Sequence, residues 1–270
     1  MTAVRSASEV LEAIQKVKAG SAGFCTNFFP VQAKVESWVA HHELTIQAFE
    51  GVTFFLRKDR DFAHLYFCAR NSARLGQRLP EFLRGTAGKL LIDIVGPEAS
   101  LTDLLNLTEQ AGFSRYSRLV RLARMAAPVQ LGGAAPTVEL ANAADAPTIL
   151  GLIEKMFDRF ADQLPTVYEI EGAIAARQIF VIKQDSEVAA LLFFETQGLT
   201  STIRYWLVGT EFHSRGFGSA LIRHYFSSQS SARRFILWVA ARNENAIQKY
   251  QHYGYAPDGL VDHELVYPNA

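Results

Sequence analysis

The stretch that decides the fold has two parts, separated by an amphipathic run and an apolar run. The first part is His213-Ser214-Arg215-Gly216-Phe217-Gly218, and the second is Asn243-Glu244-Asn245-Ala246-Ile247-Gln248-Lys249-Tyr250-Gln251-His252-Tyr253-Gly254-Tyr255. An apolar strand ends at Val208 just before the first part. The pattern then predicts a helix over 216–228, a strand over 235–241, a helix over 245–253 and a last strand over 262–267.

The glycine turn between strand and helix has the chemistry of an anion site. The first amides of a helix have no intrahelical partner, and the helix dipole places partial positive charge there. Glycine at 216 and 218 lets the backbone approach a phosphate closely, and Arg215 adds a full charge. The same spacing would also serve tight packing. The turn is neither a P-loop nor a six-residue dinucleotide fingerprint.

Both parts together resemble the GNAT superfamily of acyl-CoA-dependent N-acyltransferases. The turn is similar to that family's Arg/Gln-x-x-Gly-x-Gly/Ala pyrophosphate loop. The later part resembles its Asn-x-x-Ala-x-x-x-Tyr-x-x-x-Gly-aromatic motif. The resemblance covers about residues 140–267 and departs at His213, where the family usually has Arg or Gln.

The resemblance implies acetyl-CoA as the donor, bound between two splayed strands, here 202–208 and 235–241, with no metal. The residues it assigns to the cofactor are Leu207, Val208, His213, Ser214, Arg215, Gly216, Phe217, Gly218, Ser219, Asn243 and Ala246.

The resemblance also implies direct attack by a bound primary amine on the thioester. Tyr250 matches the tyrosine that gives a proton to the departing CoA thiolate, a role that suits a phenol of ordinary pKa near 10. Without the motif, a core aromatic residue between helix and sheet would be the favoured explanation of Tyr250, and with the motif the functional role is favoured. The general base is less clear, because Thr202 stands where some members carry a catalytic Glu. Glu195 is the substitute we select, with Glu211 and His213 as the other candidates.

The N-terminal half carries a weak repeat of the second. A helix, Ala111-Gly112-Phe113 and a strand mirror the helix, Tyr253-Gly254-Tyr255 and the last strand, about half the chain apart. It lacks the Gly-x-Gly turn and the counterparts of Asn243 and Tyr250. We therefore expect an α/β fold of two tandem GNAT-like domains, each a mixed sheet flanked by helices. The expected ranges are a degenerate domain at 1–125, a Gly/Pro/Ala-rich linker at 126–137 and the acyltransferase domain at 138–270.

Composition limits the partners. The 27 Lys and Arg balance the 27 Asp and Glu, so no overall field favours nucleic acid. No apolar run is long enough for a membrane span, and the start of the chain has no signal-peptide pattern. Cys25 and Cys68 lie in apolar surroundings and are expected to be reduced thiols. We therefore expect a cytoplasmic enzyme with a small-molecule or peptide amine as acceptor.

Two other functions remain open. The protein could bind CoA without turnover, as a regulatory or scaffold protein, a reading favoured by His213 and Thr202. It could instead use another acyl donor, such as an acyl carrier protein or aminoacyl-tRNA. No motif identifies the acceptor amine.

Overall fold

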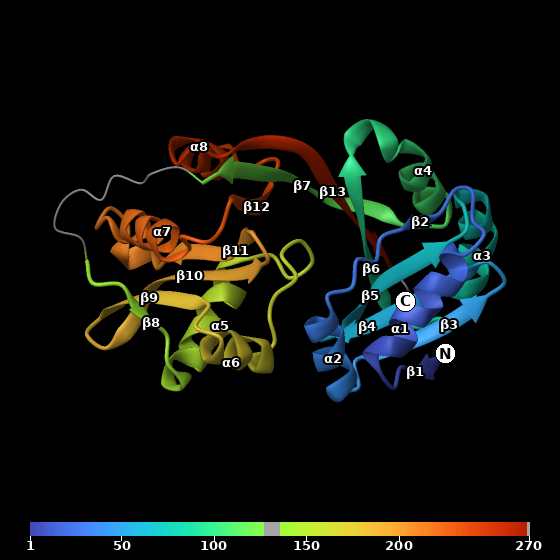
Figure 1. Cartoon of the computed structure of the whole chain (residues 1–270), viewed down its shortest axis with the longest axis horizontal. Helices are drawn as coiled ribbons and strands as arrows, with labels where there is room; N and C mark the ends of the chain where they lie inside the picture. Colours follow the sequence, from blue (N-terminus) through green and yellow to red (C-terminus); the bar gives the residue numbers. More distant parts are fainter. Residues whose placement is uncertain (127–135, 269–270) are drawn as a thin grey trace. The chain divides into compact units, whose positions relative to one another are not determined.

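The computed structural model describes residues 1–126 and 136–268, so most of the expected linker lies outside the described residues. The chain forms two compact units (Figure 1). Unit 1 contains residues 1–118 and 259–270, and unit 2 contains residues 119–258. These units differ from the expected continuous ranges 1–125 and 138–270 in two segments. Residues 119–125, the end of one strand, belong to unit 2, and residues 259–270, with the last strand of the chain, belong to unit 1.

Unit 2 is a mixed sheet with helices on both faces. Its strand order is β7-β12-β11-β10-β9-β8, and all neighbours are antiparallel except β11 and β12. The strands are β7 (Ser114–Met125), β8 (Glu139–Leu140), β9 (Ile179–Gln184), β10 (Glu187–Gln197), β11 (Thr200–Val208) and β12 (Arg234–Ala240). The helices are η2 (Ala143–Asp145), α5 (Ala146–Met156), α6 (Val167–Ala175), η3 (Thr210–Phe212), α7 (Phe217–Ser228) and α8 (Glu244–His252).

Unit 1 repeats this topology, with strand order β1-β3-β4-β5-β6-β13 and only β5 and β6 parallel. Its strands are β1 (Thr2–Ala3), β2 (Cys25–Thr26), β3 (Leu44–Phe49), β4 (Val52–Asp59), β5 (Phe62–Ala69), β6 (Lys89–Pro97) and β13 (Ala256–Tyr267). Its helices are α1 (Ala7–Lys18), α2 (Gln32–Ala40), α3 (Ser72–Arg84), η1 (Glu98–Ser100) and α4 (Thr102–Gln110).

The matching order of elements supports the repeat seen in the sequence. In each unit a short strand and two helices precede a three-stranded antiparallel meander, a helix then crosses to a parallel strand, and an antiparallel strand closes the sheet. In unit 2 that closing strand is the second half of β7, where Leu119 to Met125 pair with Ala240 to Arg234. In unit 1 it is β13, whose residues 260–267 pair with β6. Each closing strand thus comes from the other half of the sequence.

Two apolar cores cover the faces of the unit 2 sheet. One lies under α7 and includes Leu221, Tyr225 and Phe235, and the other lies under α5 and α6 and includes Ile149 and Ile170. Alternate residues of β11 face the two cores, because successive strand side chains point to opposite faces. Leu207 is in the core with α5 and α6, whereas Trp206 packs on the core with α7.

The sequence pattern predicts a helix over 143–160 and a strand over 24–29, and both are shorter in the structure. The helix expected over 143–160 ends at Met156, because Phe157 is extended and the Asp158 side chain accepts from the amides of Phe160 and Ala161, which makes a turn. The strand expected over 24–29 shortens to β2. Helix α2 was not expected; its hydrophobic pattern is weak, and it is held by a core that includes Val35 and Trp38.

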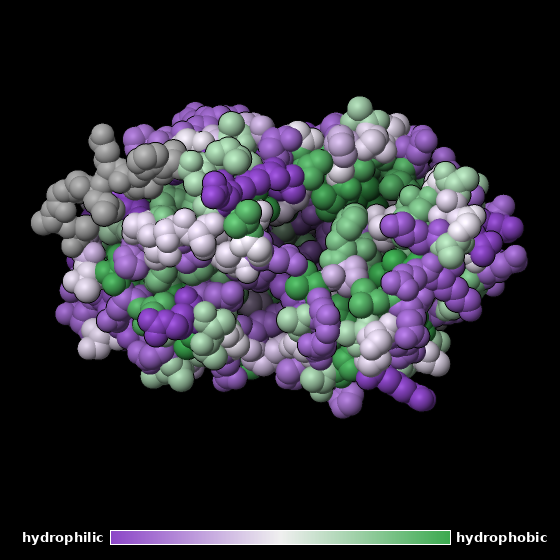
Figure 2. Space-filling view, viewed as in Figure 1, coloured by the Kyte–Doolittle hydropathy of each residue, from purple (hydrophilic) through white to green (hydrophobic). Residues whose placement is uncertain are grey.

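The surface is chemically mixed. Figure 2 shows hydrophilic residues interspersed with smaller apolar patches.

Both cysteines are free thiols, and burial raises the pKa of Cys25 to about 11 and that of Cys68 to about 12. Among the helices of residues 1–126 and 136–268, none has the length and apolar content needed to cross a membrane.

Candidate active site

The parallel strands of unit 2 separate partway along their length. Their pairing runs from Thr200↔Arg234 to Ile203↔Leu237, although β11 continues to Val208 and β12 to Ala240. The far edge of β12 stays paired with β7 to its end. Beyond that point the facing backbones of residues 204–208 and 238–240 are not paired with each other, and we call this interval between the two strands the slot.

The glycine turn meets the slot at the end of β11. Gly216 has a φ of +77°, which an L side chain rarely adopts, and it is the residue before α7. Within the described residues, the amides of Gly216, Phe217, Gly218 and Ser219 have no hydrogen-bond acceptor, and the first intrahelical bond runs from Ala220 N–H to the Gly216 carbonyl at 3.0 Å. These amides, at the positive end of a 12-residue helix, are available to an anion.

The polar residues of the turn are exposed. The His213 Nε2 is 3.2 Å from the Val208 carbonyl, so this nitrogen carries the hydrogen when it donates there. The bond ties the turn to β11. Ser214 has a φ of +67°, and the Arg215 guanidinium lies 5.4 Å from the centre of the Phe212 ring.

The two sequence motifs lie side by side. The Ser219 hydroxyl, in the first turn of α7, is hydrogen-bonded to the Tyr253 hydroxyl at 2.8 Å. The Trp206 ring is 5.6 Å from the rings of both Tyr250 and Tyr253, and it borders Gly218. Trp206 and Tyr253 were missed by the sequence reasoning, although Tyr253 follows Tyr250 by three residues, on the same helix face.

Helix α8 presents the other two motif residues. Asn243 is its N-cap, and its Oδ1 accepts from the Ala246 amide at 3.1 Å. Ala246 and Tyr250 are partly buried against the core under α7. Burial, together with the negative charge of Asp162, raises the pKa of Tyr250 to about 12. Tyr250 therefore holds its proton throughout the physiological range.

The expected base lies on the neighbouring strand. Glu195 of β10 is partly exposed, and its Oε1 is 3.9 Å from the Arg204 Nε. Thr202 is its cross-strand partner on β11. Asp262, His263 and Glu264 of β13 are buried in unit 1, on the strand paired with β6.

The structure adds a carboxylate that the sequence did not suggest. Asp162 lies between α5 and α6, in a connection without apolar periodicity, so its position could not be inferred from the sequence pattern. Burial raises its pKa to about 6, and the nearby charge of Asp158 adds to this. In the part of the chain that is described, no group of three or more His, Cys, Asp or Glu side chains is placed to hold a metal ion.

Comparison with known proteins agrees with this geometry. Residues 148–255 match the model of the acetyltransferase (GNAT) family, a range that contains β11, the glycine turn and Tyr250. These residues are a GNAT acetyltransferase domain. No curated protein sequence matches the chain significantly.

Solved structures extend the likeness beyond the GNAT domain. The GCN5-related N-acetyltransferase from Sphaerobacter thermophilus superposes with a TM-score of 0.60 at 14% identity, covering 100% of this chain and 96% of that one. A tandem GNAT protein from the clavulanic acid biosynthesis pathway gives a TM-score of 0.60 at 10% identity, covering 97% and 94%. A GCN5-related N-acetyltransferase from Kribbella flavida gives 0.57 at 16% identity, covering 90% and 98%. The chain thus has the two-domain fold of tandem GNAT proteins.

The corresponding interval between the parallel strands of unit 1 is filled by a further segment of the chain. There β5 and β6 pair only from Phe62↔Lys89 to His64↔Leu91 and then separate. Strand β2 occupies the freed edge of β5, pairing Cys25 with Ala69 and Thr26 with Cys68.

The side chain of Asn27 completes the filling. Its Nδ2 donates to the Leu65 carbonyl of β5 at 3.0 Å and to the Asp93 carbonyl of β6 at 3.1 Å. Its Oδ1 accepts from the Phe67 amide at 2.7 Å. One buried amide side chain therefore bridges the two separated strands and satisfies three of their backbone groups.

Proposed function

We propose that this protein is an acyl-CoA-dependent N-acyltransferase, with acetyl-CoA as donor and a primary amine of a small molecule or peptide as acceptor. The observation that carries the proposal is the separation of β11 from β12 beside the amides of Gly216 to Ser219, which have no acceptor among the described residues. A pantetheine arm needs exposed strand backbone, and a pyrophosphate needs N–H donors with positive potential. The backbone of β11 beyond Ile203 would meet the first need, and the amides of the glycine turn that follows β11 would meet the second.

The residues that would hold the donor follow that path. The backbone of Leu207 and Val208 would contact the pantetheine amides. The turn from His213 to Ser219 would bind the pyrophosphate through N–H groups, with Arg215 adding charge. Asn243 and Ala246, which begin α8, would border the arm from the other side. Bound acetyl-CoA supplies an activated acyl group, and the chain supplies position and protons.

Tyr250 would protonate the sulfur as the C–S bond breaks. A phenol with a pKa of about 12 is fully protonated at neutral pH, so it is ready as an acid. The backbone amides of β11 near Val208 would stabilise the negative charge that develops on the acyl oxygen. Glu195 remains a candidate base, although its pairing with Arg204 favours a structural role.

Unit 1 would then bind no CoA. Its slot is filled by residues 25–27, and we propose a supporting role for it, such as covering a sheet edge. A cytoplasmic location fits two free thiols and a CoA-dependent reaction.

Release of free CoA from acetyl-CoA, measured across a panel of primary amines, tests the enzyme proposal. We expect turnover with at least one amine class and an acylated product confirmed by mass. Stoichiometric CoA binding without turnover for any amine would favour a scaffold role. Turnover only with an acyl carrier protein or aminoacyl-tRNA as donor would favour the other acyl-donor reading.

Replacing Gly216 with valine is expected to weaken acetyl-CoA binding about 10- to 100-fold. A β-branched residue at a φ of +77° costs roughly 1–3 kcal/mol, so the turn must rearrange and its amides lose their alignment. Calorimetric titration measures the change. The matched control is Gly198→Val, which places the same residue at a φ of +57° in the β10–β11 hairpin. An equal loss of affinity in both variants would show that general strain, not the turn, is responsible.

A further inference from the structure

We propose that Asp162 is the group that accepts the proton from the attacking amine in the GNAT domain. The inference rests on the proposed N-acyltransferase function and names a base on the α5–α6 connection in place of the strand residue Glu195. It draws on the way this connection is held, on the free oxygen of Asp162, and on the charged groups around it.

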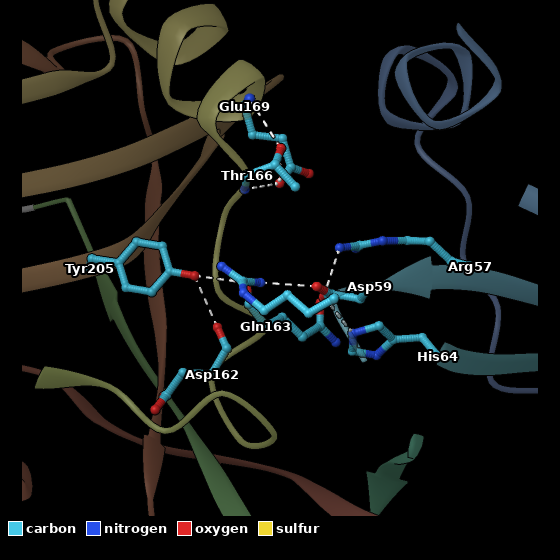
Figure 3. A network of polar contacts seen from close by, with 9 residues as sticks. Arg57, Asp59, His64, Asp162, Gln163, Thr166, Glu169 and Tyr205 are labelled. Atoms are coloured by element: carbon cyan, nitrogen blue, oxygen red, sulfur yellow. Dashed lines mark hydrogen bonds and ion pairs between the residues drawn. The ribbon is translucent and has the colours of Figure 1, made fainter. Parts of the chain in front are cut away.

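Two hydrogen bonds between Asp158 and Asp162 close a short turn in the α5–α6 connection. The Asp162 amide donates to the Asp158 carbonyl at 2.9 Å, and the Asp158 amide donates to Oδ2 of Asp162 at 2.8 Å. The phenol of Tyr205, only 2% exposed on β11, bonds to the backbone carbonyls of Asp162 and Gln163 at 2.9 and 2.8 Å (Figure 3). The backbone of the connection is therefore anchored to β11, the strand that also flanks the slot.

Only one oxygen of the carboxyl group is engaged. Oδ2 accepts the Asp158 amide, whereas Oδ1 has no hydrogen-bond partner among the described residues. A carboxylate with one anchored and one free oxygen can receive a proton without moving. Glu195 differs, because it faces the guanidinium of Arg204.

The groups around Asp162 set when it can act. Burial first, and then the charge of Asp158, raise its pKa to about 6, while the Asp158 amide and Arg204 of β11 act in the opposite direction. Its charge raises the pKa values of Tyr205 and of Tyr250 on α8. Asp162 is therefore ionised at neutral pH yet basic enough to take a proton, and its charge acts on the proposed acid, Tyr250.

The two proton transfers would support each other. The amine nitrogen forms a bond to the acyl carbon, the C–S bond breaks, the nitrogen proton passes to Oδ1 of Asp162, and the sulfur takes the phenolic proton of Tyr250. Once Asp162 is neutral, its contribution to the raised pKa of Tyr250 disappears, so the phenol becomes a stronger acid as the thiolate departs. Transfer of the proton from Asp162 to the phenolate, directly or through water, restores both groups.

The pH profile of Asp162→Asn tests this role. The wild-type kcat/KM should rise with pH through about 6, because the carboxylate is the active form above its pKa. We call this rise the acid limb of the pH profile. Asp162→Asn keeps an oxygen for the Asp158 amide, and it should lower kcat/KM about 100-fold or more and remove that limb. The control Asp185→Asn, at an exposed hairpin position with a φ of +51°, should match the wild type.

A second variant separates catalysis from structure. Asp158→Asn removes the negative charge that raises the pKa of Asp162 while keeping an oxygen for the Phe160 and Ala161 amides. The rise of its kcat/KM with pH should therefore be centred below pH 6. Without substrate, the thermal midpoint of the wild type should fall as pH rises from about 4 to 6, because the native carboxyl holds its proton more tightly than the unfolded one. Asp162→Asn should lack this component.

Three outcomes would overturn the assignment. In one, the wild type turns over, but Asp162→Asn keeps both the rise of kcat/KM near pH 6 and the wild-type value of kcat/KM. In another, the limb disappears in Glu195→Gln instead. In the third, the Asp158→Asn limb does not move. Failure of the wild type to turn over any amine would instead count against the proposed function, and only the thermal-midpoint test would still report on Asp162.

Discussion

Replacing Tyr250 with phenylalanine is expected to lower kcat by about 100- to 1,000-fold, with little change in acetyl-CoA affinity. General-acid catalysis contributes roughly that factor, and the variant removes only the hydroxyl. The ring, which packs 5.6 Å from that of Trp206, is kept. Because the tyrosine loses its proton only near pH 12, the wild type should show no alkaline fall in activity from this group below about pH 10.

Steady-state kinetics together with calorimetric titration measure both effects. The hydroxyl of Tyr250 has no hydrogen-bond partner within the described residues, so its removal should leave the thermal midpoint nearly unchanged. Tyr116→Phe, the same change at a residue that is 43% exposed in unit 1, is the control. A Tyr250→Phe enzyme with full kcat would rule out Tyr250 as the acid.

Replacing Asn27 with alanine is expected to destabilise unit 1 by about 3–5 kcal/mol. The change deletes three hydrogen bonds and leaves the Leu65 and Asp93 carbonyls and the Phe67 amide without this partner at a site that is 8% exposed. Each buried backbone group that is left unsatisfied costs roughly 1–3 kcal/mol. Urea unfolding followed by a probe in unit 1 measures the loss.

Asn106→Ala is the matched control for Asn27. Asn106 is exposed on α4 of the same unit, so the identical chemical change should alter stability by no more than about 0.5 kcal/mol. Similar stability of the two variants would show that the Asn27 side chain does not hold the separated strands together.

The sequence alone was sufficient to place those parts of the candidate site that are local motifs resembling the GNAT family. The glycine turn, the helix after it and the motif from Asn243 to Tyr255 were all placed in the elements where the structure has them. Glycine with a positive φ and a helix N-cap are local features, and few tertiary contacts alter them. The repeat of the two halves was also readable, through Gly112 and Gly254, which both have a positive φ.

The missed features depend on contacts between distant residues. Nothing local indicates that the second half of β7 closes the sheet of unit 2 or that β13 closes that of unit 1. The role of Asn27 requires two strands that are 38 and 66 residues away in the chain. The place of Asp162 could not be predicted, because the apolar spacing is helical up to Phe160. In the structure the turn at Asp158 ends the helix earlier, at Met156.

The number of acetyl-CoA sites per chain tests the central claim most directly. Calorimetric titration of the 270-residue chain should give one site, which is weakened in Gly216→Val and unchanged in Gly198→Val. The open slot between β11 and β12 accounts for that site, and the slot filled by Asn27 accounts for the lack of a second. Two sites per chain, no site, or one site unaffected by Gly216→Val would contradict the account.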